Sequence, residues 1–366
     1  MLVDTLSIWA AIAVGLLMLV LYWRTRWNYT KFEELRPDPK SDALDVTVVI
    51  PARNEARLIG DCVKSFPSGV RVIVMNDGSS DATAKIARDA GAEVFEAPRL
   101  KRNTMGKPSA CFAAVEHVTT KYMLFVDADT RFEPAFLPTL IGYANAHSLD
   151  MVSLFLKRKH PNLLSAVFMP YAYALYFAGI NVKSVHSLNL MHTKKALANG
   201  QCILFGASAY AFTGGHRTLL NEVLDDIEIA RLAKRHRLKF QIMRGERLGS
   251  ARMYESFTDA WRGFQKNTMR LLAYNPGATA MSVLTALISY AYVPMLMWLW
   301  SDREEDYVVV TFWTFAVLPF LPFLAWYRNP IGLFAPVISH VFPLIGINAL
   351  ARWLLGVNDV WKGRKV

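Results

Sequence analysis

The feature that most constrains the fold of this chain is a regular alternation of short apolar runs with segments of helical spacing. The runs that predict strands span residues 46–50, 70–75, 92–95 and 122–126. The segments that predict helices lie between them, over residues 55–65, 82–90 and 106–117. Strands that alternate with helices in this way are typical of an α/β domain with a mostly parallel sheet.

Polar residues follow three of the predicted strands, at the points where those strands end. Since the carboxyl ends of parallel strands lie at one edge of a sheet, and ligands bind at that edge, we expect these groups to converge. In chain order they are Arg53, Asn54 and Glu55, then Asp77 and Gly78, then Asp127 and Asp129.

The pair Asp127 and Asp129 is the most informative of these groups. Two carboxylates one residue apart at the end of a buried strand can hold a divalent cation and, through it, a diphosphate. The alternative is a solvated turn with two surface acids. Lys107 follows a glycine at a predicted helix start, where a phosphate could bind, and the alternative is a surface lysine. Asp77 could accept hydrogen bonds from a base or form a turn, and Gly78 allows a positive φ.

Four long apolar segments flank this region, over residues 6–23, 278–300, 307–327 and 331–355. The first is uncharged and long enough to cross a bilayer, and the basic residues after it predict that the next domain is cytoplasmic. We expect an N-terminal membrane anchor over residues 1–30, a cytoplasmic domain over 42–275, membrane segments over 276–356 and a basic cytoplasmic tail over 357–366.

The last apolar segment is ambiguous. A third complete crossing would place Lys362, Arg364 and Lys365 outside, against the tendency of basic residues to stay on the cytoplasmic side. We therefore expect two spans followed by either a third span or a re-entrant segment, and favour the second. The aromatic stretch 162–180 is either a core helix or an interfacial segment that lines an entrance for a lipid.

The composition limits the classes of partner that this chain is expected to bind. The net charge of +11 fits lipid headgroups and a diphosphate ligand, because the chain carries no nucleic-acid-binding motif. The cysteines, Cys62, Cys111 and Cys202, match no zinc spacing and suit a reduced compartment.

Taken together, these motifs resemble those of the family 2 glycosyltransferases of the GT-A fold. The resemblance runs from Val46 to about Asn275. It is carried by Pro51-Ala-Arg-Asn-Glu55, Asn76-Asp-Gly-Ser79, Gly106-Lys107, Asp127-Ala-Asp129, Thr213-Gly-Gly215 and Leu224-Asp-Asp226. Within the family, the chain is most similar to membrane-anchored hopene-associated and diaponeurosporenoate glycosyltransferases. Arg252-Met-Tyr254 and Ala260-Trp-Arg262 carry this likeness, and Trp361-Lys-Gly-Arg364 is similar to the tail of ceramide glucosyltransferases.

The resemblance implies a GT-A nucleotide-diphospho-sugar transferase domain plus transmembrane helices, and a role for each matching position. Asp129, with Asp127, would bind Mn²⁺ or Mg²⁺. Asp226 would be the catalytic base, with Asp225 as the second choice; the alternative is that both acids stabilise the start of a helix. The acceptor side would hold Gly214, Gly215 and Trp261. The nucleotide sugar, expected to be a UDP-sugar, would contact Pro51, Ala52, Asn54, Glu55, Asp77, Lys107, Asp127 and Arg262.

One motif departs from the family pattern. Many membrane members carry Q-x-x-R-W after the base, and this chain does not, which disfavours a processive polysaccharide synthase. The leading hypothesis is an inverting, metal-dependent transferase that moves a sugar to a membrane lipid, in a multi-pass protein of the cell membrane. The alternatives are a polyprenyl-phosphate glycosyltransferase, a membrane-bound nucleotidyltransferase and an inactive scaffold.

Overall fold

The computed structural model describes residues 23–38, 44–99, 104–159, 181–187, 190–254 and 256–274, with isolated residues and short stretches elsewhere. The chain divides into two compact units. One consists of Phe32–Lys159 and Asn181–Met253, and the other of Met1–Lys31, His160–Ile180 and Tyr254–Val366. The first unit contains the large sheet and nearly all of the predicted site.

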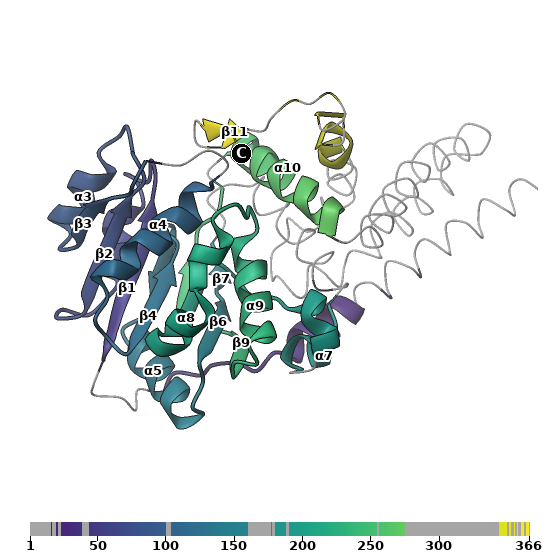
Figure 1. The fold of residues 1–366 in the computed structure, drawn as a ribbon, viewed down its shortest axis with the longest axis horizontal. Helices are drawn as coiled ribbons and strands as arrows, with labels where there is room; N and C mark the ends of the chain where they lie inside the picture. The colour runs from purple at the N-terminus through teal and green to yellow at the C-terminus, as the bar shows by residue number, and fades with distance from the viewer. Residues whose placement is uncertain are drawn as a thin grey trace, which may run out of the picture. The chain divides into compact units, whose positions relative to one another are not determined.

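A seven-stranded sheet with the order β3-β2-β1-β4-β8-β6-β9 forms the centre of this unit (Figure 1). β1 pairs in parallel with β2 and β4, β2 with β3, and β6 with β9. β8 runs antiparallel to both β4 and β6, a reversal that the sequence pattern did not predict. The predicted α/β class and mostly parallel sheet are confirmed. The strands are β1 (Val46–Ala52), β2 (Arg71–Asn76), β3 (Glu93–Glu96), β4 (Tyr122–Val126), β6 (Met151–Phe155), β8 (Cys202–Gly206) and β9 (Phe240–Arg244).

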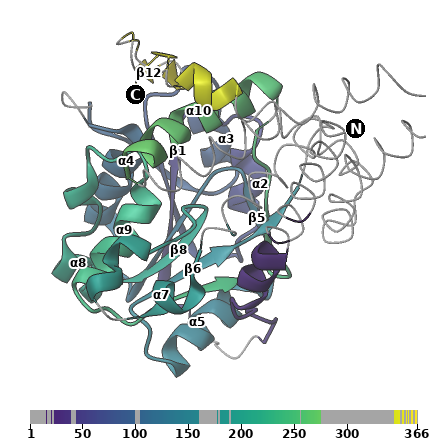
Figure 2. The same cartoon turned by 90° about the vertical axis from the view of Figure 1, so that its right-hand side faces the viewer.

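Helices cover both faces of the sheet, because side chains of a strand alternate between its faces. Val48 and Ile50 point to the face covered by α2 (Ile59–Lys64), α3 (Thr83–Asp89) and α5 (Phe136–Ala146), where they join the main hydrophobic core. The opposite face carries α4 (Gly106–Ala114), α8 (Ala207–Thr213) and α9 (Asp225–Arg235), as the two views in Figures 1 and 2 show.

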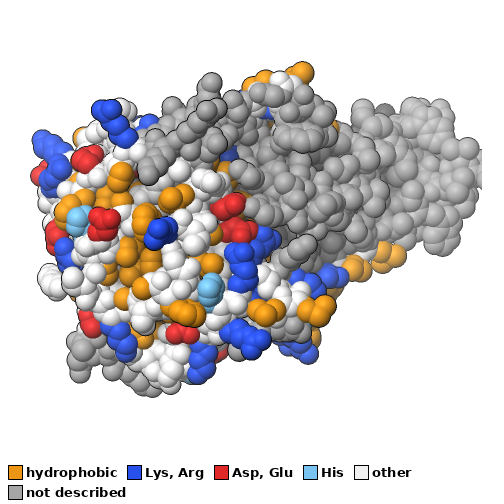
Figure 3. Space-filling view, in the orientation of Figure 1, with side chains coloured by type: hydrophobic (Ala, Val, Ile, Leu, Met, Phe, Trp, Pro, Cys, Tyr) orange, Lys and Arg blue, Asp and Glu red, His pale blue; other side chains and the backbone are white. Residues whose placement is uncertain are grey.

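Smaller elements complete the unit. β5 (Thr130–Phe132), β10 (Gly249–Ala251) and β7 (Lys157–Arg158) form a three-stranded sheet next to the main core. Short helical turns are η1 (Val115–His117), α7 (Val182–His186), η2 (Leu190–Lys195) and η3 (Gly215–Leu219). In the orientation of Figure 1, the outer surface over α4, α8 and α9 mixes apolar, basic and acidic side chains (Figure 3).

The predicted helix over residues 55–65 is shorter in the structure, since α2 begins only at Ile59. Asn54 has a φ of 53°, which is incompatible with a right-handed α-helix, and the Glu55 backbone N–H donates to Thr83 Oγ1 at 2.7 Å. The turn after β1 is therefore tied to the start of α3 instead of continuing as a helix. At the start of α3, Asp81 accepts a hydrogen bond from the Thr83 N–H at 3.0 Å.

In the second unit, the structure describes α10 (Phe257–Tyr274) and a hairpin of β11 (Val360–Trp361) and β12 (Arg364–Lys365). The predicted membrane segments lie wholly or largely outside the described residues. Within the part of the chain that is described, none of the helices combines the length and the apolar character needed to span a bilayer.

Candidate functional site

The carboxyl ends of β1, β2 and β4 lie side by side at one edge of the large sheet. Ala52, the last residue of β1, is in register with Asn76, the last of β2, and both strands run parallel to their neighbours. Three predicted groups of polar residues therefore follow strands that end at the same edge, as the sequence predicted.

Hydrogen bonds join the polar residues that follow β1 to those that follow β2. The Asp77 N–H donates to Ala52 O at 2.8 Å, and the Arg53 guanidinium donates to Asp77 O at 2.6 Å and Gly78 O at 3.1 Å. Asn54 Oδ1 accepts from the Ser80 N–H at 2.9 Å. Gly78 has the positive φ, 63°, that its position predicted. The turns after β1 and β2 thus form one hydrogen-bonded platform, within which Asn54 has a structural role besides the predicted nucleotide contact.

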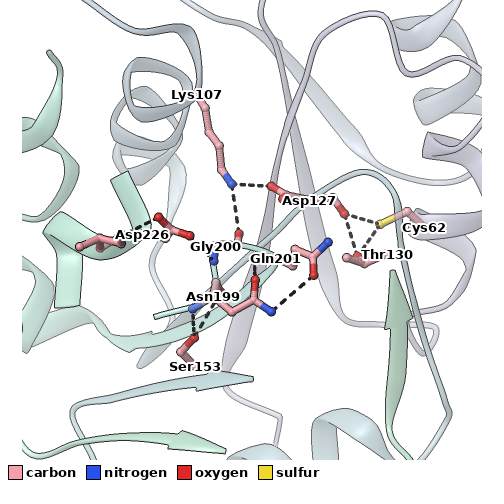
Figure 4. A network of polar contacts seen from close by, with 10 residues as sticks. Cys62, Lys107, Asp127, Thr130, Ser153, Asn199, Gly200, Gln201 and Asp226 are labelled. Atoms are coloured by element: carbon pink, nitrogen blue, oxygen red, sulfur yellow. Dashed lines mark hydrogen bonds and ion pairs between the residues drawn. The ribbon is translucent and has the colours of Figure 1, made fainter. Parts of the chain in front are cut away.

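The third group is paired with the predicted phosphate-binding lysine (Figure 4). Lys107 Nζ, at the start of α4, lies 2.6 Å from Asp127 Oδ1, beyond the end of β4. Both side chains are about one-third exposed, 34% for Lys107 and 30% for Asp127. Burial disfavours the charged lysine, but the charges of Asp127 and Asp225 outweigh it and raise its pKa. Lys107 is therefore a fixed cation at the edge of the sheet.

The predicted base, Asp226, lies at the start of α9 on the other side of the same lysine. Its Oδ1 accepts a hydrogen bond from the Ile227 N–H at 2.8 Å, and its Oδ2 accepts one from the Gly200 N–H at 3.2 Å. Burial and the charge of Asp225 raise its pKa from 3.8 to about 6, against the opposite effect of Lys107 and of the two N–H groups. A carboxylate that titrates near neutral pH can accept a proton in catalysis. The contact with Ile227 also supports the helix start, and the role of Asp226 as the catalytic base stays a prediction.

A turn at Gly200, which the sequence pattern did not predict as part of the site, joins these groups. Lys107 Nζ donates to Gly200 O at 3.1 Å, the Gly200 N–H donates to Asp226, and the Asp127 N–H donates to Gln201 O at 3.3 Å (Figure 4). The signal was present, since Asn199-Gly200 is a turn-forming pair directly before the apolar run that becomes β8.

The residues present suit a divalent cation of the kind expected. Among the described residues, no three His, Cys, Asp or Glu side chains form a group that could hold a metal. Mg²⁺, however, commonly binds one or two carboxylates and takes its other ligands from substrate phosphates and water. Asp127 and Asp129, on the short connection between β4 and β5, supply that donor set.

The residues predicted to lie on the acceptor side make contacts within the protein itself. Gly214 ends α8 with a φ of 79°, and Gly215 is buried against the ring of Tyr210. Trp261 and Arg262 belong to α10, in the second compact unit, where Trp261 Nε1 donates to Gln265 Oε1 at 3.2 Å. Their contacts with an acceptor or a nucleotide stay predictions.

Comparison with known proteins agrees with the motifs. Residues 47–167 match the family described as glycosyl transferase family 2. A 4,4'-diaponeurosporenoate glycosyltransferase of Staphylococcus haemolyticus is 27% identical over 258 residues, 66% of this chain and 65% of that protein. The protein of that name from Staphylococcus aureus is 29% identical over 256 residues, 68% of this chain and 66% of that protein. The match thus spans just under two thirds of the length of these relatives.

The fold also matches a solved structure. The mannosyltransferase PcManGT from Pyrobaculum calidifontis, in complex with GDP-Man and Mn²⁺, superposes with a TM-score of 0.52. The match covers 93% of this chain and 99% of that one at 17% sequence identity, so it establishes a common fold.

Proposed function

Because residues 47–167 match the family described as glycosyl transferase family 2, we propose that this protein moves a sugar from a nucleotide-diphosphate donor to a hydroxyl or carboxyl group of a membrane lipid. One observation carries the proposal: Asp127, Lys107 and Asp226 meet around Gly200 at the ligand-binding edge of the sheet. The lipid acceptor is supported by the names of the staphylococcal relatives.

The residues on the two sides of Lys107 would have different roles in the reaction. On the strand side, Asp127 and Asp129 would hold Mn²⁺ or Mg²⁺, which would neutralise charge on the departing diphosphate. The fixed cation of Lys107 adds positive charge close to Asp127, within reach of a phosphate that binds beside it. The platform formed after β1 and β2 would hold the nucleoside, as the motif at Pro51, Ala52 and Glu55 implies.

On the helix side, Asp226 would remove the proton from an acceptor hydroxyl as that oxygen attacks the sugar. A single displacement of this kind inverts the configuration at the sugar carbon. With its pKa raised to about 6, the carboxylate is ionised at neutral pH yet basic enough to take the proton. Asp225, one residue earlier, stays the second choice.

We also propose the membrane organisation that the sequence predicts, with an anchor over residues 1–30, spans within residues 276–356 and a cytoplasmic catalytic domain. A donor made in the cytoplasm would then reach the sheet edge directly.

The test is transfer by the full-length protein in detergent. It would be incubated with radiolabelled UDP-glucose, UDP-galactose or GDP-mannose, a total lipid extract, and Mn²⁺, Mg²⁺ or a chelator. We expect labelled lipid with at least one donor, and no product with the chelator. Label released by mild acid would identify a polyprenyl-phosphate product, and transfer of labelled nucleotide would identify a nucleotidyltransferase.

Asp129→Ala separates an enzyme from a scaffold. Loss of a group that stabilises the departing diphosphate should lower turnover by about 100-fold or more. Asp89→Ala, at an exposed position on α3, should leave turnover unchanged. Folding of both variants is checked by circular dichroism. Equal turnover in Asp129→Ala and the unaltered protein would contradict the metal site, and the absence of transfer by the unaltered protein with every donor would contradict the proposed function.

A further inference from the structure

The turn formed by Asn199, Gly200 and Gln201 lies between the two halves of the site. Gly200 O accepts from Lys107 Nζ at 3.1 Å, and the Gly200 N–H donates to Asp226 Oδ2 at 3.2 Å. Gln201 O accepts from the backbone N–H of Asp127 at 3.3 Å. Backbone atoms of two consecutive residues thus contact the predicted diphosphate side and the predicted base.

The turn is itself anchored in the sheet. The Asn199 N–H donates to Ser153 Oγ at 2.8 Å, and Ser153 Oγ donates back to Asn199 O at 3.2 Å. Asn199 Nδ2 donates to Leu154 O at 3.1 Å. Ser153 and Leu154 belong to β6, and Ser153, Leu154 and Asn199 are all buried. Because buried hydrogen bonds of this kind hold a backbone in place, the position of Gly200 is set by β6.

Glycine at position 200 is required for space and not for backbone conformation. Its φ lies outside the left-handed region, so another residue could adopt the backbone. A Cβ there, however, would lie 3.1 Å from Asp226 Cβ and 3.2 Å from Lys107 Nζ. Any side chain would push the lysine or the aspartate away.

We propose that the Asn199–Gln201 turn is the positioning element of this site: the two peptide groups of Gly200 hold the Asp127–Lys107 pair at a set distance from Asp226. The proposal rests on the proposed function, since it assigns the turn a role in sugar transfer. Gly200 contacts the side chains of Lys107 and Asp226, and Gln201 contacts the backbone of Asp127, so the residues of the turn act by positioning.

The groups around Asp226 determine how a displaced turn would change its ionisation. The titratable groups that act on its carboxyl are Asp225 on the same helix and Lys107 from α4, and Asp127 and Cys111 act in turn on Lys107. The Gly200 N–H and the charge of Lys107 both favour the ionised carboxylate. Moving either away should make Asp226 harder to ionise, and the base form should then appear only at higher pH.

The experiment compares Gly200→Ala with Gly206→Ala in the full-length protein, using the lipid extract and the donor that the unaltered protein accepts. Gly206 has a φ of −68°, and a Cβ there would lie 3.6 Å from Asp150 O, an ordinary contact. We expect Gly200→Ala to lower kcat by about 10- to 100-fold, more than it changes KM. The acidic limb of kcat/KM should move up by about one pH unit. Gly206→Ala should behave like the unaltered protein.

Ser153→Ala provides a second variant that adds no bulk near the reacting groups. It removes the two hydrogen bonds between Ser153 and Asn199 and leaves the bond from Asn199 Nδ2 to Leu154 O, so it should shift the same pH limb in the same direction, by less. If circular dichroism shows that Gly200→Ala does not fold, the pH profile of Ser153→Ala tests the positioning role instead. An unaltered protein that transfers sugar, together with unchanged pH profiles in the folded variants, would overturn the positioning role. Absence of transfer by the unaltered protein would instead overturn the proposed function.

Discussion

At the scale of single residues, the environment of Asp226 differs from that of an ordinary, solvent-exposed aspartate. Its carboxyl is held between the Ile227 and Gly200 N–H groups, beside the charges of Asp225 and Lys107. Its pKa of about 6 means that the folded chain binds this proton more tightly than the unfolded chain, where the value is 3.8. Ionisation therefore costs folding free energy, and stability from this group falls as the pH rises from 3.8 to about 6.

Asp226→Asn should therefore lower activity and raise stability. We expect sugar transfer to fall by at least about 100-fold, the usual contribution of a general base. At pH 8 the variant should be more stable by roughly 1–3 kcal/mol, because the cost of the buried charge is gone. This gain should disappear near pH 4. Denaturant unfolding at the two pH values, with transfer assays, measures both effects.

Asp225→Asn is the matched control for that experiment. If it lowers transfer more than Asp226→Asn does, the second-choice residue is the base. A stability gain equal at both pH values would show that the raised pKa of Asp226 is not its source.

At the scale of elements, the connection from α8 to η3 explains the Thr213-Gly-Gly215 motif through packing. Tyr210 Oη accepts from the His216 N–H at 2.9 Å and lies 2.9 Å from His216 Nδ1. The His216 ring meets Phe125 of β4 edge-on at 4.7 Å, two residues before Asp127. Burial and then the charge of Lys107 lower the pKa of His216 to about 3, so the ring is neutral at physiological pH. The motif thus packs a neutral pair of rings behind the strand that carries the aspartates.

Gly215→Ala should disrupt this packing. A Cβ at this position would lie 2.1 Å from the Tyr210 ring, and the residue has a φ of +45°. Gly69→Ala measures the cost of a positive φ for alanine without a steric clash, because Gly69 has a φ of +90° and open space around it. We expect Gly69→Ala to cost about 1 kcal/mol and Gly215→Ala at least about 3 kcal/mol of the free energy of unfolding.

Denaturant unfolding of the two variants measures the difference. Equal losses would mean that backbone strain alone accounts for the glycine.

At the scale of the whole molecule, the proposal to be tested is that the chain crosses a membrane. The segments predicted to cross it fall wholly or largely outside the described residues, and the described helices include none suited to span a bilayer. The proposed topology places residue 2 outside the cell and the basic tail inside. The native thiols Cys62, Cys111 and Cys202 are buried, and burial raises the pKa of each, so they should react slowly with a labelling reagent.

Single cysteines introduced by Leu2→Cys and Val366→Cys test this topology with an impermeant maleimide. In intact cells, the first should label and the second should not; after permeabilisation, both should label. Ready labelling of Val366→Cys in intact cells would contradict a cytoplasmic tail and would favour three complete crossings after the catalytic domain.

The sequence alone predicted the strand–helix alternation, the polar groups at the strand ends and the Asp127–Asp129 pair, because each depends on neighbours only a few residues away. The antiparallel β8 and the turn at Gly200 were not. Gly200 meets Lys107 from 93 positions away and Asp226 from 26 positions away. Such contacts depend on which distant strands pair, and the pKa of Asp226 depends on the burial and the charges that those contacts create. Local pattern therefore predicted which residues would carry the chemistry, and long-range packing set how close they lie and how they ionise.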